Sequence, residues 1–157
     1  MGIEIERKFL VQGDGWRAAA GSGTRMRQGY VVVGPSASVR VRMSGEHAWL
    51  GIKSMTAGVT RAEFEYEIPR ADADRILDHL CSGVIIEKTR YRLEHGDHVW
   101  VIDVFDGENA GLIVAEIELS SESEVFSKPD WAGEEVSHDP RYYNAVLSER
   151  PYRTWDH

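Results

Sequence analysis

Residues 2–11 read Gly-Ile-Glu-Ile-Glu-Arg-Lys-Phe-Leu-Val, and charged and apolar side chains alternate through most of this stretch. Glu4, Glu6 and Lys8 fall on every second residue. Successive side chains of a β-strand point to opposite faces of the sheet, so this spacing predicts a strand with one ionisable face and one apolar face. A strand of this kind needs apolar packing on one side and charged partners, water or a ligand on the other.

The same two-residue period recurs downstream, as in Val39-Arg-Val-Arg-Met43 and Glu63-Phe-Glu-Tyr-Glu67. Short turns such as Ala57-Gly58 separate the repeats, which favours antiparallel hairpins over parallel crossovers. The expected strands cover residues 2–11, 28–33, 38–43, 47–54, 60–69, 84–94, 98–106 and 112–120.

Three helices are expected between or after these strands. Residues 71–80 place Ala73, Ile76, Leu77 and Leu80 on one stripe, and Gly83 is expected to end the helix. Shorter helices are expected at 121–126, from its Ser and Glu start signals, and at 143–149, before a proline. The chain is therefore expected to form a single, mainly β (α+β) domain over residues 1–157.

The charged faces are too uniform for ordinary solvated strands, because nearly every outward position in several strands is ionisable. Like charges also sit two residues apart on the same strand, where they repel unless a partner or ligand lies between them. A sheet closed into a barrel around a charged lumen resolves both points and removes its open edges. The lumen set comprises Glu4, Glu6, Glu63, Glu65, Asp103, Glu116, Glu118, Lys8, Arg40, Arg42, Lys53, Lys88 and Arg90.

These residue types indicate a metal and a polyanion. Carboxylates without cysteine suit a hard, oxygen-seeking cation such as Mg²⁺ or Mn²⁺. Two such ions would make the nearly neutral lumen strongly positive. A phosphate chain then fits, because its oxygens satisfy arginine and lysine and also bridge metal ions.

Composition excludes several other classes of protein. With 18 Lys and Arg against 26 Asp and Glu, the formal charge is −8, so a broad basic surface for nucleic acid is not expected. The single cysteine, Cys81, excludes an internal disulfide and a zinc site built on cysteines, and none of the six histidines is expected to bind metal. The absence of a long apolar run and of a signal peptide predicts a cytoplasmic protein with no membrane partner.

The ordered motifs resemble those of one family. Glu4-Ile-Glu-Arg-Lys8 resembles the ExExK signature of the CYTH superfamily, the triphosphate tunnel metalloenzymes. The resemblance continues nearly end to end, through Arg27-Gln-Gly-Tyr30, Val39-Arg-Val-Arg42, Arg61-Ala-Glu-Phe-Glu65, Glu87-Lys-Thr-Arg-Tyr91 and Ala115-Glu-Ile-Glu118. The tail from Trp131 to Asn144 resembles the C-terminal plug of short bacterial members.

This resemblance implies an eight-stranded antiparallel β-barrel, a triphosphate tunnel, with a few peripheral helices and a C-terminal plug helix. It further implies hydrolysis of inorganic tripolyphosphate, or of other triphosphates such as nucleoside triphosphates. One metal would hold the substrate and a second would place a water in line with a terminal phosphorus. Homodimers are common in the family.

Residue roles are likewise implied by the resemblance. The metal-site carboxylates would be Glu4, Glu6, Glu63, Glu65, Glu116 and Glu118, and the phosphate ligands Lys8, Arg40, Arg42, Lys53, Lys88 and Arg90. Lys53 with Tyr30 resembles the dyad proposed to activate the water, although Lys53 could equally be only a phosphate ligand. Asp103 would orient a cation or hold a metal-bound water. For Asp103, Glu67 and Arg92, a purely structural ion pair is at least as good an interpretation.

Three alternatives remain open at this stage, because a fold and a metal site do not settle the reaction. An adenylyl cyclase would need an adenine pocket and a base for the ribose 3′-hydroxyl. A thiamine triphosphatase would need an aromatic sandwich, for which Trp49 and Trp131 are candidates, whereas Trp100 is expected on the outer face. A non-catalytic polyphosphate or nucleotide sensor would gain nothing from the carboxylates. Tyr143 and Ala145 occupy positions that are lysine in some relatives. A lysine there would contact the terminal phosphate, so its absence bears on the length of phosphate chain that the protein prefers.

Overall fold

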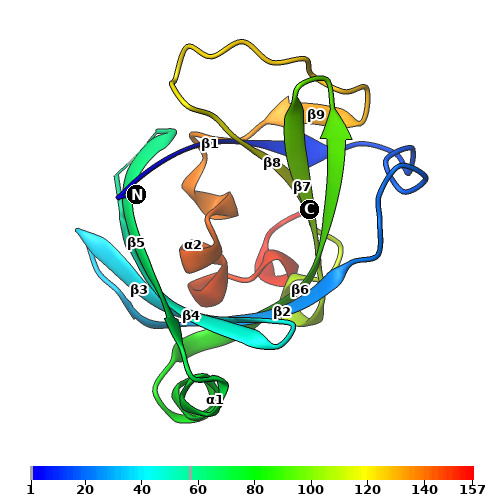
Figure 1. The fold of residues 1–157 in the computed structure, drawn as a ribbon. Coiled ribbons are helices and arrows are strands. Elements are labelled where there is room, and N and C mark those ends of the chain that lie inside the picture. The colour runs from blue at the N-terminus through cyan, green and yellow to red at the C-terminus, as the bar shows by residue number, and fades with distance from the viewer. Residues whose placement is uncertain (1, 57) are drawn as a thin grey trace.

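A ring of eight antiparallel strands dominates the computed structural model, which describes residues 2–56 and 58–157 (Figure 1). Its ring order is β1-β8-β7-β6-β2-β3-β4-β5, and pairing of β5 with β1 closes it. The ring strands are β1 (Ile3–Val11), β2 (Thr24–Val33), β3 (Ala37–Ser44), β4 (His47–Ser54), β5 (Thr60–Ile68), β6 (Ser82–His95), β7 (His98–Phe105) and β8 (Ile113–Glu118). The predicted closed, eight-stranded barrel is confirmed.

Strand β1 holds the ring together because it has three partners. One edge pairs with β8, from Glu6 opposite Glu118 to Leu10 opposite Val114. The other edge is shared: residues 3–5 pair with β5, and residues 9–11 pair with a short ninth strand, β9 (Ala132–Glu135). Residues 6–8 therefore lie where one partner strand gives way to the other.

The outer face of the ring is apolar and is covered by peripheral segments. Helix α1 (Arg70–His79) packs Ala73 and Leu77 against Val41, Met43 and Ala48 of β3 and β4. On the other side, segments 12–20 and 119–131 cover a second core that includes Phe9, Trp16 and Trp100. Trp100 lies in this outer core, as the strand alternation predicts.

One end of the lumen is closed by the C-terminal segment. Helix α2 (Asn144–Glu149) lies inside the ring outline in Figure 1 and packs Ala145 and Leu147 against Ile86, Phe105 and Val114. Three single-turn helices flank this region: η1 (Gly107–Asn109), η2 (Pro140–Tyr142) and η3 (Tyr152–Thr154). The predicted helix at 143–149 is thus present as α2 and forms the plug.

A close backbone approach at Gly83 helps to seat this plug. Gly83 has a φ of 72°, a conformation that side-chain-bearing residues rarely adopt. A Cβ atom at this position would lie only 2.4 Å from the carbonyl oxygen of Ser148. Glycine is therefore required for β6 to run against the end of α2.

Four sequence-based details are wrong. Residues 121–126 form turns and extended chain rather than a helix, because the Glu124 carboxylate accepts from the Ser120 N–H and contacts His98, while Phe126 packs on Trp100. So short a segment cannot sustain a helix without packing of its own.

In α1, Leu80 lies beyond the last turn and is 62% exposed, and the helix ends at His79, ahead of Gly83. Strand β2 begins at Thr24 rather than at residue 28, and β9 was not expected. The turn expected at Ala57-Gly58 lies partly outside the described residues. In the described part of the chain, no helix is long and apolar enough to cross a membrane.

Candidate active site

The lumen holds a cavity of about 450 Å³ whose wall is mostly charged. Every member of the predicted lumen set lines it except Asp103, which is buried behind two of the cations. Among the residues that the structure describes, its carboxylates are Glu4, Glu6, Glu63, Glu65, Glu116 and Glu118, and its cations are Lys8, Arg40, Arg42, Lys53, Arg61, Lys88, Arg90 and Arg92.

The carboxylates of the cavity are confined to one sector of the ring. All six carboxylates come from three adjacent strands, β8, β1 and β5. Across the lumen, β3 and β6 carry Arg40, Arg42, Lys88, Arg90 and Arg92, with β2 between them. A ligand inside the tunnel would therefore meet a carboxylate wall, which also carries Lys8 on β1, Lys53 on β4 and Arg61 on β5, and an opposite wall whose described charged lining is cationic.

The carboxylate wall carries uncompensated repulsion. Glu6 and Glu118 are direct cross-strand partners, an arrangement that is destabilising for like charges. Burial, together with the nearby Glu116 and Glu4, raises the pKa of Glu6 to about 8. Glu118 also has a raised pKa, because of burial and its proximity to Glu4 and Glu63.

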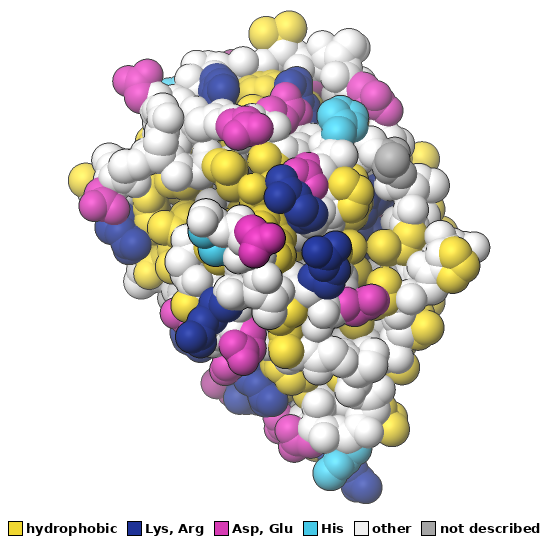
Figure 2. Space-filling view, turned by 180° about the vertical axis from the view of Figure 1, so that it is seen from behind, with side chains coloured by type: hydrophobic (Ala, Val, Ile, Leu, Met, Phe, Trp, Pro, Cys, Tyr) yellow, Lys and Arg dark blue, Asp and Glu magenta, His cyan; other side chains and the backbone are white. Residues whose placement is uncertain are grey.

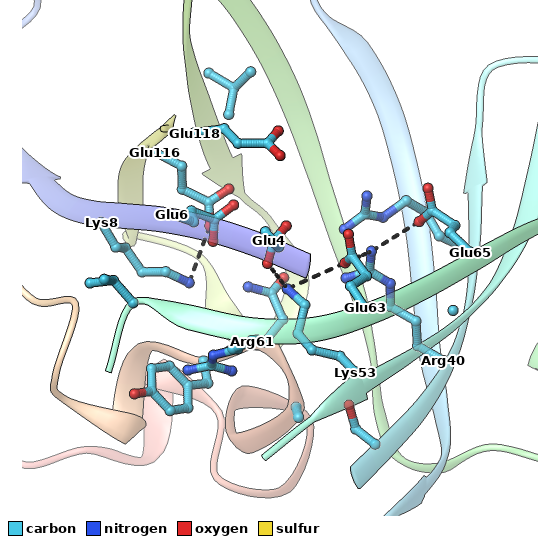
Figure 3. Close-up of a pocket in the computed structure, with 18 of the residues that line it drawn as sticks. Glu4, Glu6, Lys8, Arg40, Lys53, Arg61, Glu63, Glu65, Glu116 and Glu118 are labelled. Carbon is cyan, nitrogen blue, oxygen red and sulfur yellow. Dashed lines mark hydrogen bonds and ion pairs between the residues drawn. The ribbon is translucent and has the colours of Figure 1, made fainter. Parts of the chain in front are cut away.

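Lys53 and Arg40 neutralise part of this wall (Figure 3). Lys53 Nζ lies 2.7 Å from Glu4 and 3.6 Å from Glu63. Arg40 contacts Glu65 at 3.2 Å and Glu63 at 3.7 Å. The Arg40 and Glu65 side chains lie over Gly51, where a Cβ atom would lie 3.4 Å from Nε of Arg40.

Deeper in the tunnel, Glu116 and Asp103 hold three cations. Glu116 contacts Lys8 at 3.1 Å and Arg90 at 3.2 Å. Asp103 accepts two hydrogen bonds from Arg90, at 2.7 and 2.8 Å, and contacts Lys88 at 2.9 Å. Burial opposes ionisation of Asp103, but Lys88 and Arg90 outweigh it and lower the pKa to about 2. Asp103 therefore orients cations from behind the cavity wall.

Lys88 differs from the other tunnel lysines. It is 1% exposed, and burial together with Arg90 and Arg42 lowers its pKa to about 7, despite the opposing effect of Asp103. Its ammonium also donates to Asn144 Oδ1 at 2.9 Å. An amine with this pKa is present in both protonation states near neutral pH.

The structure does not bring Tyr30 and Lys53 into contact. Both line the cavity, but the Tyr30 hydroxyl accepts from Gln28 Nε2 at 3.2 Å, and Gln28 in turn donates to Asn144. Through these two amides, Tyr30 is connected to Lys88 rather than to Lys53, whose described partners are Glu4 and Glu63.

Several tunnel residues were not assigned to the site from the sequence, although Arg92 was weighed there as a structural ion pair and Tyr143 as a plug residue. Arg61 shares the inward face of β5 with Glu63, so its spacing could have placed it in the lumen; its guanidinium lies 4.0 Å from the ring centroid of Tyr143. Arg92 also lines the cavity. Tyr143 and Asn144 reach it only because the plug folds back into the ring, and no periodicity signals that. Glu67 lies outside the cavity and pairs with His47 at 2.7 Å.

The acidic wall has the donor chemistry of a divalent-cation site. Within residues 2–56 and 58–157, no three His, Cys, Asp or Glu side chains already converge in a metal-binding arrangement. Several of the carboxylates contact lysine or arginine instead. Burial is the largest cause of the raised pKa of Glu6, and the nearby Glu116 and Glu4 add to it. Clustered carboxylate oxygens of this kind fit Mg²⁺ or Mn²⁺.

One outer face of the molecule shows no such sorting of charge. On the face shown in Figure 2, acidic and basic side chains are interspersed among apolar ones. The gathering of six carboxylates on three adjacent strands of the lumen marks the tunnel as the candidate functional site.

Comparison with known proteins agrees with this geometry. Residues 2–143 match the CYTH domain. The chain is 46% identical over 155 residues to an inorganic triphosphatase of Acetivibrio thermocellus, covering 99% of each chain. It is 37% identical over 153 residues to an inorganic triphosphatase of Nitrosomonas europaea, covering 92% of this chain and 96% of the relative.

Solved structures point the same way. The crystal structure of an inorganic triphosphatase superposes with a TM-score of 0.64 and 33% sequence identity, covering 92% of this chain and 93% of the other. The arrangement of β1, its partners and the charged tunnel thus coincides with a family match over most of the sequence. The protein belongs to the CYTH domain family.

Proposed function

We propose that this protein is a divalent-metal-dependent inorganic triphosphatase that hydrolyses tripolyphosphate inside the tunnel. The observation that carries the proposal is the two-sided lumen, with carboxylates on β8, β1 and β5 opposite cations on β3 and β6. A compact polyanion alone would be repelled by the first wall, and a metal ion alone would be repelled by the second. A metal–triphosphate complex is complementary to both.

The residues divide between the two components. We propose that Mg²⁺ or Mn²⁺, most simply as a pair of ions, is held by Glu4, Glu6, Glu63, Glu65, Glu116 and Glu118. When bound, the metal would neutralise phosphate oxygens and activate the attacking water. The phosphate oxygens would be bound by Lys8, Arg40, Arg42, Lys53, Lys88 and Arg90, with Arg61 added from the structure. Asp103 supports the site by fixing Lys88 and Arg90.

Two lysines compete for the role of proton acceptor. Lys53 is the candidate expected from the sequence, and its Nζ contacts the carboxylates of Glu4 and Glu63. Lys88 has a pKa lowered to about 7 and is connected to Tyr30 through Gln28 and Asn144. We therefore propose that Lys88, with Tyr30, receives the proton from water, and that Lys53 binds phosphate and braces Glu4.

The test is release of phosphate from tripolyphosphate, ATP and thiamine triphosphate with Mg²⁺, with Mn²⁺ and with EDTA. Glu116→Gln removes a tunnel carboxylate, and Glu67→Gln is the matched change outside the cavity. We expect metal-dependent turnover of tripolyphosphate that is lost in the first variant and kept in the second. Conversion of ATP to cyclic AMP and pyrophosphate would establish a cyclase instead. Tight triphosphate binding without turnover would establish a sensor.

The two lysines are separated by a second pair of variants. Lys88→Met should abolish the base-dependent limb of the pH profile of kcat and reduce kcat by about 10²–10⁴, the usual contribution of a general base. Lys53→Met should chiefly raise KM. The reverse pattern would return the role of base to Lys53.

A further inference from the structure

The side chain of Asn144 connects the plug to the tunnel wall. Its Oδ1 accepts hydrogen bonds from Gln28 Nε2 at 3.0 Å and from Lys88 Nζ at 2.9 Å. Gln28 is fully buried on β2, and Lys88 is almost fully buried on β6. A single amide oxygen from the C-terminal segment therefore joins two strands of the ring from inside.

The orientation of this amide follows from the donor chemistry of its neighbours. Arg42 can only donate, and its Nε donates to Gln28 Oε1 at 3.0 Å. Gln28 must therefore direct its NH₂ group toward Tyr30 and Asn144. Asn144 consequently presents its carbonyl oxygen to Gln28, and the same oxygen faces the ammonium of Lys88. The chain of contacts is fixed from Arg42 to Lys88 with no freedom to flip.

The Nζ of Lys88 has one charged and one neutral acceptor. Asp103 on β7 contacts its Nζ at 2.9 Å, so Asp103 and Asn144 take two of its three N–H groups. The charged and titratable groups that face it from the surrounding strands are Asp103 on β7, Glu116 on β8, Arg90 on β6 and Arg42 on β3, with the Tyr30 phenol on β2. Of its two acceptors, only Asn144 is uncharged and comes from the plug.

We propose that Asn144 is a positioning residue of the tunnel, which holds Lys88 Nζ in the cavity wall and sets its proton affinity from the plug. A neutral acceptor supports the ammonium enough to hold it in place, whereas a second carboxylate beside Asp103 would lock Lys88 in the protonated form. Seating of α2 thereby completes the site, and an unseated plug would leave Lys88 with one acceptor. The inference rests on the proposed function only for the use made of that proton.

The test compares Asn144→Asp, Asn144→Ala and Ser148→Ala. Ser148 is a buried plug residue whose hydroxyl donates to the carbonyl of Ala145 within α2, so its removal disturbs the plug without touching Lys88. The titration of Lys88 is followed by NMR of lysines labelled with ¹³C at Cε, in protein without metal or substrate. Lys88→Met assigns the signal.

Asn144→Asp keeps the shape of the side chain and adds a charge, so the pKa of Lys88 should rise by about 1–3 units. Asn144→Ala removes an acceptor from the charged form and should lower it. Ser148→Ala should reduce the melting temperature and leave the Lys88 titration unchanged. A Lys88 titration that stays within 0.3 units of wild type in Asn144→Asp would overturn the proposal, whatever the effect on stability.

Activity then separates this inference from the proposed function. In Asn144→Asp, the acidic limb of the kcat profile for tripolyphosphate should move to higher pH by the same shift that NMR reports, with little change in KM. Wild-type protein that does not hydrolyse tripolyphosphate would refute the proposed function. The NMR shift would still stand in that case, because it requires no turnover.

Discussion

Replacing Glu6 by glutamine should stabilise the metal-free protein. Glu6 is on the carboxylate wall, directly across from Glu118, and its pKa is raised from 4.5 to about 8 by burial and by Glu116 and Glu4. Glutamine has nearly the same shape and cannot ionise. The variant therefore removes the repulsion and keeps most of the packing.

The size of the effect follows from the pKa difference. A pKa shift of about 3.5 units lowers the free energy of unfolding by about 5 kcal/mol at a pH where Glu6 is ionised in both the folded and the unfolded state, at ~1.36 kcal/mol per unit. At pH 7 the folded state still holds most of its protons, so the penalty there is about 3 kcal/mol. For a chain of this size that is a rise in melting temperature of roughly 6–12 °C. These are upper values, because glutamine does not reproduce every contact of the carboxylate.

The sign of the pH dependence is equally specific. The pKa is higher in the folded state than the ordinary value of 4.5, so the folded state binds the proton more tightly. Wild-type stability should therefore fall between pH 4.5 and 8 by this component, and Glu6→Gln should lack that fall. Thermal and urea unfolding at several pH values in EDTA measure both quantities, with Glu67→Gln as the control outside the tunnel.

With divalent metal bound, wild type should become more stable than Glu6→Gln. Mg²⁺ or Mn²⁺ bound by the carboxylate wall would stabilise wild type by an amount that grows with the logarithm of the ratio of metal concentration to Kd, and Glu6→Gln should gain much less. Equal melting temperatures for wild type and Glu6→Gln at pH 8 in EDTA would refute the description of this wall. A variant whose stability falls with pH as steeply as that of wild type would refute it as well.

Two further perturbations probe the buried pairs and the plug. Asp103→Asn leaves Lys88 and Arg90 without their shared carboxylate and should cost about 3–5 kcal/mol in urea unfolding at pH 7. Because the pKa of Asp103 is lowered to about 2, its contribution should disappear from wild type as the pH falls from 3.8 toward 2, and the variant should show no such loss. Gly83→Ala adds a Cβ 2.4 Å from the Ser148 carbonyl and should cost more than Gly13→Ala, which has nearly the same φ and open space; equal melting temperatures would contradict the close approach.

The barrel and most of its lumen were predictable because charged residues at every second position indicate two things at once. In β1 and β3, the alternation identifies the strand and also assigns each side chain to a face. Glu67 shows the limit of that logic: it has the inward parity of Glu65, yet it lies outside the cavity, paired with His47. Parity gives the face of a strand but not the depth along the barrel.

The unpredicted parts depend on contacts between distant segments. Strand β9 exists because β5 leaves the second half of β1 unpaired, and its Ala-Gly-Glu-Glu sequence has no strand pattern of its own. Asn144 enters the site only when α2 folds into the ring, which follows from Leu147 packing on Ile86 rather than from any local motif. The helix expected at 121–126 was lost to side-chain contacts of Glu124 and Phe126 with the neighbouring strand.

The three partner strands of β1 all lie far from it in sequence, and this separation bears on how the ring closes. Strands β2 to β5 pair with their neighbours in sequence, as do β6 to β8, and the β2–β6 pairing joins the two groups. Strand β1 instead pairs with residues 60–62 on one edge and with residues 114–118 on the other. Strand β1 therefore joins the ring only through contacts of long sequence separation, and contacts of this kind form slowly. Until they form, Glu4, Glu6 and Lys8 have no tunnel to face, so the site is complete only when the ring is closed.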